Sequence, residues 1–145
     1  MNSAGLLPGL LVFTALGIAG CFVLRFTRLH RKDLAFQYKL FFIAYIVRFI
    51  LSIVVYQTDL VNVLGDEDSS GWYNGVVLEQ RWEAEKIGVT DLPRVWTEAY
   101  DGEHRGYFYL LGMLFTITGT PERLVAAALN CFFGALTVVF TLRIG

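Results

Sequence analysis

Four stretches of mostly apolar residues constrain this chain more than any other feature. The chain has 145 residues, is 55% hydrophobic and has a mean hydropathy of +0.52, which is high for a soluble domain. A helix needs about 20 mostly apolar residues to cross the hydrocarbon core of a bilayer. We therefore predict an all-α fold, a polytopic membrane helix bundle with about four membrane helices, at about 6–26, 40–64, 105–120 and 123–143.

Two of these stretches need comment. The third, at 105–120, is short, and crossing would require flanking residues or a position tucked beside its neighbours. The first resembles a signal peptide in its apolar start, but its basic residues follow the apolar run, whereas a signal peptide has them in front. The chain also stops without a polar tail, which favours a single N-terminal membrane region of a longer protein.

Basic residues predict how the bundle is oriented. Those around the first connection indicate a cytoplasmic position by the positive-inside rule: Arg25, Arg28, Arg31, Lys32 and Lys39. The N-terminus and the long acidic loop at 65–104 are then outside. With four crossings, the short turn at 119–123 is expected in the cytoplasm.

The main candidates for catalytic residues follow the second apolar stretch, where Gly65 precedes Asp66, Glu67 and Asp68. One reading is that Asp66 or Asp68 is a general base that activates an acceptor hydroxyl or amine. A second reading is that the two Asp residues hold a divalent metal, since Mg²⁺ and Mn²⁺ prefer oxygen ligands. A third is structural, because Asp68 is well placed to cap a helix.

The outer loop itself predicts an amphipathic surface helix over about 70–87. Its apolar positions recur at helical spacing, Ser69 or Ser70 suits the start, and Gly88 suits the stop. Such a helix lies flat on a membrane, with one face against the membrane or the bundle. That face comprises Tyr73, Val77, Gln80, Ala84 and Ile87.

Several further side chains have both functional and structural readings. Trp72 and Tyr73 adjoin the acids and could form a wall for a sugar or an isoprenoid, or lie at the membrane interface. His104 and Arg105 suit either an interfacial anchor or a cationic pocket for a lipid phosphate. Arg48, inside the second stretch, either snorkels towards the cytoplasm or is buried for a function.

Other function classes find little support. Cys21 and Cys131 fall inside membrane stretches without metal-like spacing, which favours a role as small apolar fillers. No basic patch lies outside the first connection, so nucleic acid is not an expected partner.

The order of these features resembles the GT-C class of polytopic glycosyltransferases, and within it family 39, the protein mannosyltransferase and aminoarabinose transferase group. There an outer-loop acidic motif, Gly-Asp-(Asp/Glu), precedes an aromatic residue and a surface helix, as 65–67 precede Tyr73 here. Residues 105–110 resemble a Pro-Gly-Tyr-x-x-Leu motif with Arg105 in place of Pro, and 129–136 resemble Leu-Asn-x-x-x-Gly-Ala-Leu. The likeness covers roughly 40–145.

The resemblance implies a bacterial inner-membrane enzyme whose donor is a sugar on a polyprenyl phosphate. It also implies a catalytic or acceptor-orienting Asp in the outer loop, and the spacing leaves Asp66 and Asp68 both eligible. The expected partners are the lipid bilayer and the remaining membrane helices of a longer chain. The competing hypotheses are a non-enzymatic anchoring or assembly subunit and a transporter fragment, although no broken helix pair marks a transport site.

Overall fold

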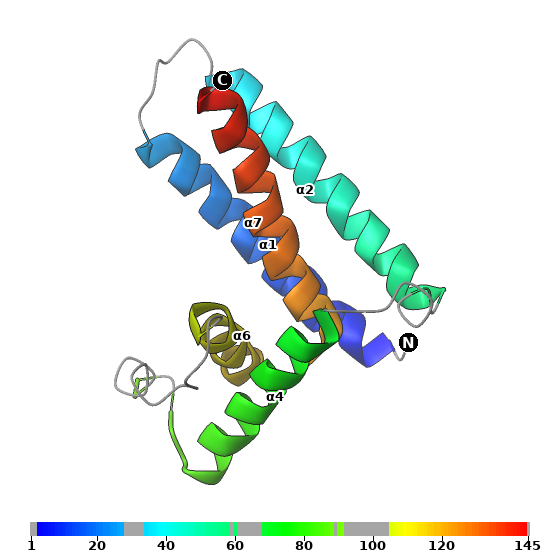
Figure 1. The fold of residues 1–145 in the computed structure, drawn as a ribbon, viewed down its shortest axis with the longest axis vertical. Helices are drawn as coiled ribbons and strands as arrows, with labels where there is room; N and C mark the ends of the chain where they lie inside the picture. The colour runs from blue at the N-terminus through cyan, green and yellow to red at the C-terminus, as the bar shows by residue number, and fades with distance from the viewer. Residues whose placement is uncertain are drawn as a thin grey trace.

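The protein is a three-helix bundle with a pair of shorter helices folded against one end. A computed structural model describes residues 3–27, 34–58, 60, 68–88, 90–91 and 105–144. Every regular element in those ranges is an α-helix, which confirms the predicted all-α fold (Figure 1). The helices are α1 (Ser3–Phe26), α2 (Leu34–Gln57), α4 (Asp68–Ala84), α6 (Arg105–Thr118) and α7 (Arg123–Ile144).

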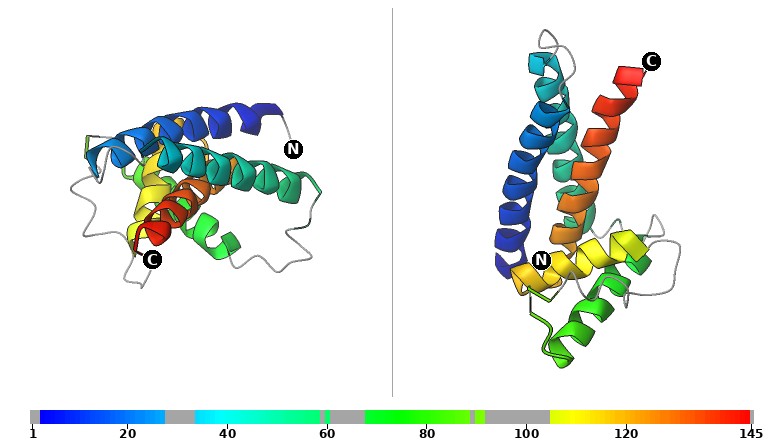
Figure 2. Two further views of the ribbon diagram at one scale, coloured as in Figure 1. Left: turned by 90° about the horizontal axis from the view of Figure 1, so that it is seen from above. Right: turned by 90° about the vertical axis from the view of Figure 1, so that its left-hand side faces the viewer.

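Three helices, α1, α2 and α7, are long and apolar enough to cross a membrane. Their apolar spans are Leu6–Phe26, Leu34–Gln57 and Arg123–Leu142. Helix α7 is the central one, because 56% of its span is buried against 22% for α1 and 17% for α2. Figure 2 shows these three helices running side by side, whereas α4 and α6 cross one end of the bundle at a steep angle.

Helix α6 differs from the expected membrane helix at 105–120. It has 14 residues, and at about 1.5 Å per residue it is roughly 21 Å long, short of the roughly 30 Å hydrocarbon core. It packs mainly against α4. Within the described part of the chain, the structure therefore has three membrane-length helices where the sequence suggested about four.

The direction of α7 decides which segments share an end of the bundle. Helices α1 and α7 start together, since a methyl group at Gly9 would lie 2.7 Å from the Cβ of Leu124. Helix α2 runs the opposite way, so that its start and the C-terminus of α7 lie at the same end of the bundle (Figures 1 and 2). We call the end where α1 and α7 start the α4 end, and the other the basic end.

The turn at 119–122 therefore lies at the α4 end, the same end at which α2 finishes. The expectation that 119–123 lies on the side of the first connection is wrong. The physical reason is that α6 is too short to cross the membrane. The chain therefore enters and leaves α6 on the same side, and the turn that follows stays on that side.

Aromatic packing joins α1 to α2. The Phe13 ring stacks on Tyr45 and Phe49, with centroids 4.2 and 4.1 Å apart. The Tyr45 and Tyr38 hydroxyls donate to the carbonyl oxygens of Phe13 (2.9 Å) and Cys21 (3.2 Å), so neither hydroxyl is unsatisfied in an apolar surrounding. These contacts fix the two helices as an antiparallel pair.

The boundaries of α2 also differ from prediction. The sequence placed the second membrane helix at 40–64, but α2 spans Leu34–Gln57. It starts earlier because Leu34 to Phe36 continue the apolar pattern and the long Lys39 side chain is tolerated near a membrane boundary. It ends at Gln57, just before the polar Thr58, and residues 61–64 lie outside the described ranges.

Cysteine labelling can test whether the end of α2 and the turn at 119–122 lie on the same side of the membrane. With Cys21 and Cys131 replaced by Ala, single cysteines at Thr58, Glu122 and Thr27 are treated with a membrane-impermeant maleimide in sealed vesicles. We expect Thr58→Cys and Glu122→Cys to label from one side and Thr27→Cys from the other. Labelling of Glu122→Cys together with Thr27→Cys would contradict the structure.

Candidate functional site

The candidate site lies at the α4 end, where the acidic run leads into α4. Helix α4 starts at Asp68, so the expected start at Ser69 or Ser70 is too late and both serines lie inside the helix. Asp66, Glu67 and His104 lie outside the described residues. Asp68 and Arg105 are described through their backbone as the first residues of α4 and α6. The roles predicted for these five residues therefore stay predictions.

Trp72 ties the first turns of α4 to the start of α7. Its Nε1–H donates to the Pro121 carbonyl oxygen at 2.9 Å. The guanidinium carbon of Arg123 lies 5.0 Å from the centre of the Trp72 ring, a cation–π distance. The half-buried indole thus holds α4 against the turn that leads into the central helix. Trp72 therefore has a clear structural role beside any contact with substrate.

The end of α4 is closed by backbone geometry rather than by Gly88. The helix stops at Ala84, three residues before the expected end. Lys86 takes a left-handed conformation with φ of 55°. Its N–H donates to the Glu83 carbonyl, and the Ile87 N–H donates to the Trp82 carbonyl, at 3.0 and 2.8 Å. These two bonds form a Schellman cap, which usually contains Gly but here contains Lys.

The buried face of α4 packs against α6. The shared cluster comprises Leu78, Trp82, Phe108 and Tyr109, with the Trp82 and Tyr109 rings edge to face at 5.6 Å. At Gly112 an added Cβ would lie 2.9 Å from the Trp82 ring, so only Gly allows this approach. The packed face is built on Trp82, and Ile87 of the predicted face packs against it, whereas Tyr73, Gln80 and Ala84 are exposed. The helical period was right, but α6 was not foreseen as the packing partner.

Tyr73 lies on the opposite side of α4, and 62% of it is exposed. It makes no part of the described core, whereas the neighbouring Trp72 does. The structure thus separates the two aromatics that the sequence treated as one wall. Trp72 faces the protein, and Tyr73 faces its surroundings.

The two later segments quoted for the family resemblance meet in the structure. The Tyr107 hydroxyl, near the start of α6, donates to Asn130 Oδ1 in α7 at 2.8 Å. Asn130 is half-buried in a mainly apolar helix, where its amide needs such a partner. This bond holds the start of α6 close to α7 and so sets the position of the α4–α6 pair.

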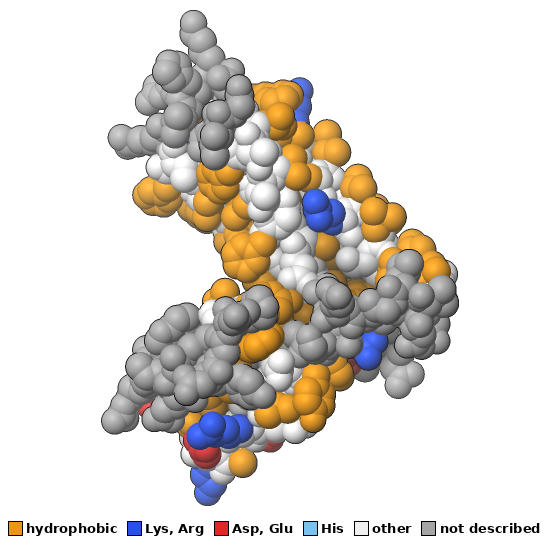
Figure 3. Space-filling view, in the orientation of Figure 1, with side chains coloured by type: hydrophobic (Ala, Val, Ile, Leu, Met, Phe, Trp, Pro, Cys, Tyr) orange, Lys and Arg blue, Asp and Glu red, His pale blue; other side chains and the backbone are white. Residues whose placement is uncertain are grey.

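Among the described residues, the part of α4 farthest from the bundle carries charges of both signs (Figure 3). Arg81 and Glu85 form an exposed ion pair at 2.9 Å, which contributes little to stability. Partial burial, with a smaller contribution from the Glu83 charge, raises the pKa of Glu79. Glu79 thus lies partly towards the packed side of the helix.

Arg123 is the residue at this end that sequence reasoning missed. It was assigned to the cytoplasmic turn, but it lies over Trp72. A cation in the first turn of a helix opposes the helix dipole, and the Trp72 ring offsets that cost. The Thr120 hydroxyl beside it is buried and has no partner among the described residues. The sequence signal for this position was the short length of 105–120. A helix that does not cross the membrane leaves Arg123 on the same side as the start of α4.

No metal centre can be assigned from the described ranges, where no three His, Cys, Asp or Glu residues converge. The magnesium or manganese reading rested on Asp66 and Asp68, whose carboxylates lie outside them. It stays a prediction. No protein-family model, curated protein or solved structure matches the chain.

The anchoring role of Trp72 can be measured against its neighbour. Trp72→Ala leaves the Pro121 carbonyl without its donor, at a cost of about 1–3 kcal/mol, and removes the Arg123 contact. We expect amide hydrogen exchange along α4 to accelerate in bilayer nanodiscs. Tyr73→Ala is the matched control, because Tyr73 is 62% exposed and should change exchange little. Equal acceleration in both variants would contradict the assignment.

Proposed function

We propose that this chain is the N-terminal membrane part of a lipid-linked-sugar glycosyltransferase that works at the α4 end of the bundle. The reaction transfers a sugar from a polyprenyl phosphate to an acceptor on the outer face of a bacterial inner membrane. The proposal draws on the family resemblance of the sequence. It is supported by how the described helices arrange charge around that end.

Basic residues support the orientation. Arg25 and Lys39 flank the first connection, and Arg143 lies in the last turns of α7, which ends at the same end of the bundle. The positive-inside rule favours the cytoplasm for that end. The α4 end is then the outer one, as a lipid-linked donor on the outer face requires.

The observation that carries the proposal is the anchoring of the start of α4. Because Trp72 is bonded to Pro121, the helix that begins at Asp68 starts close to the first turn of α7, at the membrane boundary. Asp66 comes two residues before Asp68, and the proposal assigns the general base to one of these two residues. A general base in that position can reach an acceptor in water while the donor stays in lipid.

The chemistry assigned to these residues is a displacement at the anomeric carbon of the donor sugar. A carboxylate of Asp66 takes the proton of the acceptor hydroxyl or amine, whose oxygen or nitrogen forms the new glycosidic bond. The bond to the lipid phosphate breaks, and the phosphate keeps the electron pair. Arg123, which is exposed at the same end, supplies a cation for that phosphate. Arg105 and His104 are the earlier candidates for this role.

A second function, a non-enzymatic assembly subunit, is favoured by a different observation. Arg48 lies in the middle of α2, and no acidic side chain in the described part of the chain pairs with it. An intramembrane cation of this kind suits a contact with another membrane helix. The two functions are distinguished by whether carboxylates at the α4 end are needed for chemistry.

The test uses the full open reading frame in membranes supplied with polyprenyl-phosphate sugars. Asp66→Asn should slow transfer by about 10²–10⁴-fold without loss of inserted protein, as expected for a general base. Asp68→Asn should leave stability nearly unchanged, because Asn caps a helix about as well as Asp, whereas Asp68→Ala should lower it by about 1 kcal/mol. Removal of divalent metal with a chelator tests the magnesium or manganese reading of the same pair.

Asp91→Asn is the matched control, because Asp91 is an acid of the same loop whose carboxylate accepts a bond from the Gly88 N–H at 3.2 Å in a local turn. It should transfer sugar at the wild-type rate. Wild-type rates in Asp66→Asn, Asp68→Asn and the double variant would overturn the general-base assignment. Absence of sugar transfer by the unsubstituted protein would overturn the enzymatic proposal and favour the assembly subunit.

A further inference from the structure

Arg48 lies at the centre of a membrane-spanning helix. It is nine residues from Lys39 and nine from Gln57, the last residue of α2. At about 1.5 Å per residue, both are roughly 13–14 Å away, and the hydrocarbon core is about 30 Å thick. A charge at this depth is costly and is kept where it faces a partner or a water-filled cavity.

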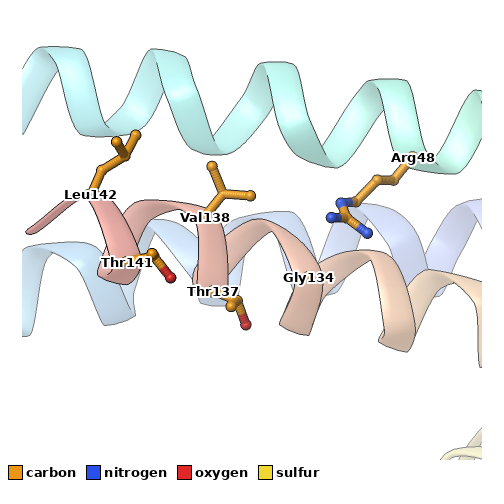
Figure 4. A pocket seen from close by; sticks show the side chains of 6 residues that line it. All are labelled: Arg48, Gly134, Thr137, Val138, Thr141 and Leu142. Atoms are coloured by element: carbon orange, nitrogen blue, oxygen red, sulfur yellow. The ribbon is translucent and has the colours of Figure 1, made fainter. Parts of the chain in front are cut away.

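The Arg48 side chain extends from α2 towards α7 at the level of Gly134 (Figure 4). A Cβ at Gly134 would lie 2.9 Å from Nη1 and 3.2 Å from Nε of Arg48. Gly134 thus leaves room for the guanidinium, which any larger side chain would displace. Figure 3 shows Lys or Arg atoms within the mainly hydrophobic surface over the middle of α2.

From Arg48 a groove of about 470 Å³ follows α7 towards the basic end of the bundle. Apart from Arg48, the groove is lined by residues of α7 at helical spacing: Gly134, Thr137, Val138, Thr141 and Leu142. Val138 and Leu142 point towards α2, whereas Thr137 and Thr141 point away from it (Figure 4). Small and hydroxyl side chains of this kind let a neighbouring membrane helix approach closely. Arg48 and Thr137 are exposed, so the groove opens to the surroundings of the bundle.

The chain does not supply a counter-charge for Arg48 from its own membrane helices. The spans Leu6–Phe26, Leu34–Gln57 and Arg123–Leu142 contain no Asp or Glu. For the same reason, a second copy of these spans could not supply a carboxylate. A lipid phosphate also fits poorly, because phosphates lie at the interface, about half a bilayer thickness from the midplane.

We propose that the groove between α2 and α7 is the docking site for a transmembrane helix from outside these residues, one that carries an Asp or Glu at the bilayer midplane. A carboxylate can accept two parallel N–H bonds from the guanidinium of Arg48. The apolar and small side chains of the groove pack against the rest of the incoming helix. This inference is independent of the proposed glycosyltransferase activity.

A membrane two-hybrid selection tests the proposal with designed helices as probes. Three libraries of apolar helices of about 20 residues share a randomised small-residue face and differ only at the central position, which is Glu, Gln or Leu. We expect the Glu library to yield partners for the wild-type chain about tenfold more often than the other two. Arg48→Leu should abolish that excess, and Arg48→Lys should retain part of it.

The role of the groove can be tested with a substitution at Thr137, for which Thr14 on α1 provides a matched control. Thr137 and Thr14 are both exposed, and each hydroxyl donates to a carbonyl one turn earlier in its own helix, at 2.9 and 2.8 Å. Thr137→Leu fills the groove and should reduce recovery of the Glu partners, whereas Thr14→Leu should not. Arg48→Leu makes α2 more apolar, so failure to insert does not explain its loss of partners.

Two results would overturn the proposal. One is equal recovery from the three libraries, or an excess of Glu partners that persists in Arg48→Leu. The other is retention of an anionic phospholipid, measured by native mass spectrometry with phosphatidylglycerol, that depends on Arg48 and excludes the selected Glu helices. That result would assign the groove to a lipid headgroup.

Discussion

The close contact between α1 and α7 at Gly9 and Leu124 is the constraint on which the rest of the structure depends. Because Gly9 has no side chain, the two helices approach until a Cβ at that position would lie 2.7 Å from the Cβ of Leu124. The two helices therefore start at the same end and run parallel. The chain between α2 and α7 must then begin and finish on one side, so α4 and α6 lie together at the α4 end.

Because α4 and α7 both start at this end, the two segments lie close together in the structure. Trp72, at the start of α4, is bonded to Pro121 and lies under Arg123, at the start of α7. The acidic run before α4 thus leads to a boundary that also carries a cation. Within the bundle, Arg48 has a different environment, because it lines a groove on α7. The two proposals therefore concern different parts of the bundle.

The sequence predicted elements whose signals are local and missed those that depend on tertiary contacts. The apolar runs at 6–26 and 123–143 closely match α1 and α7, because length and hydropathy decide membrane spans. The surface helix was predicted to within three residues at each end, and Ile87 of its predicted face packs against the Trp82 cluster. Its packing against α6 was missed because 105–120 was taken as a membrane span. Arg123 could not be placed correctly for the same reason. The roles of Asp66 and Asp68 rest on sequence alone.

Oxidative cross-linking in membranes can show directly whether α1 and α7 run parallel. In a chain with Cys21 and Cys131 replaced by Ala, the pair Gly9→Cys and Leu124→Cys should form a disulfide, because their Cβ atoms lie within bonding reach after a small shift. The pair Gly9→Cys and Leu142→Cys should not, since Leu142 lies at the opposite end of α7. A disulfide in the second pair and none in the first would contradict the account.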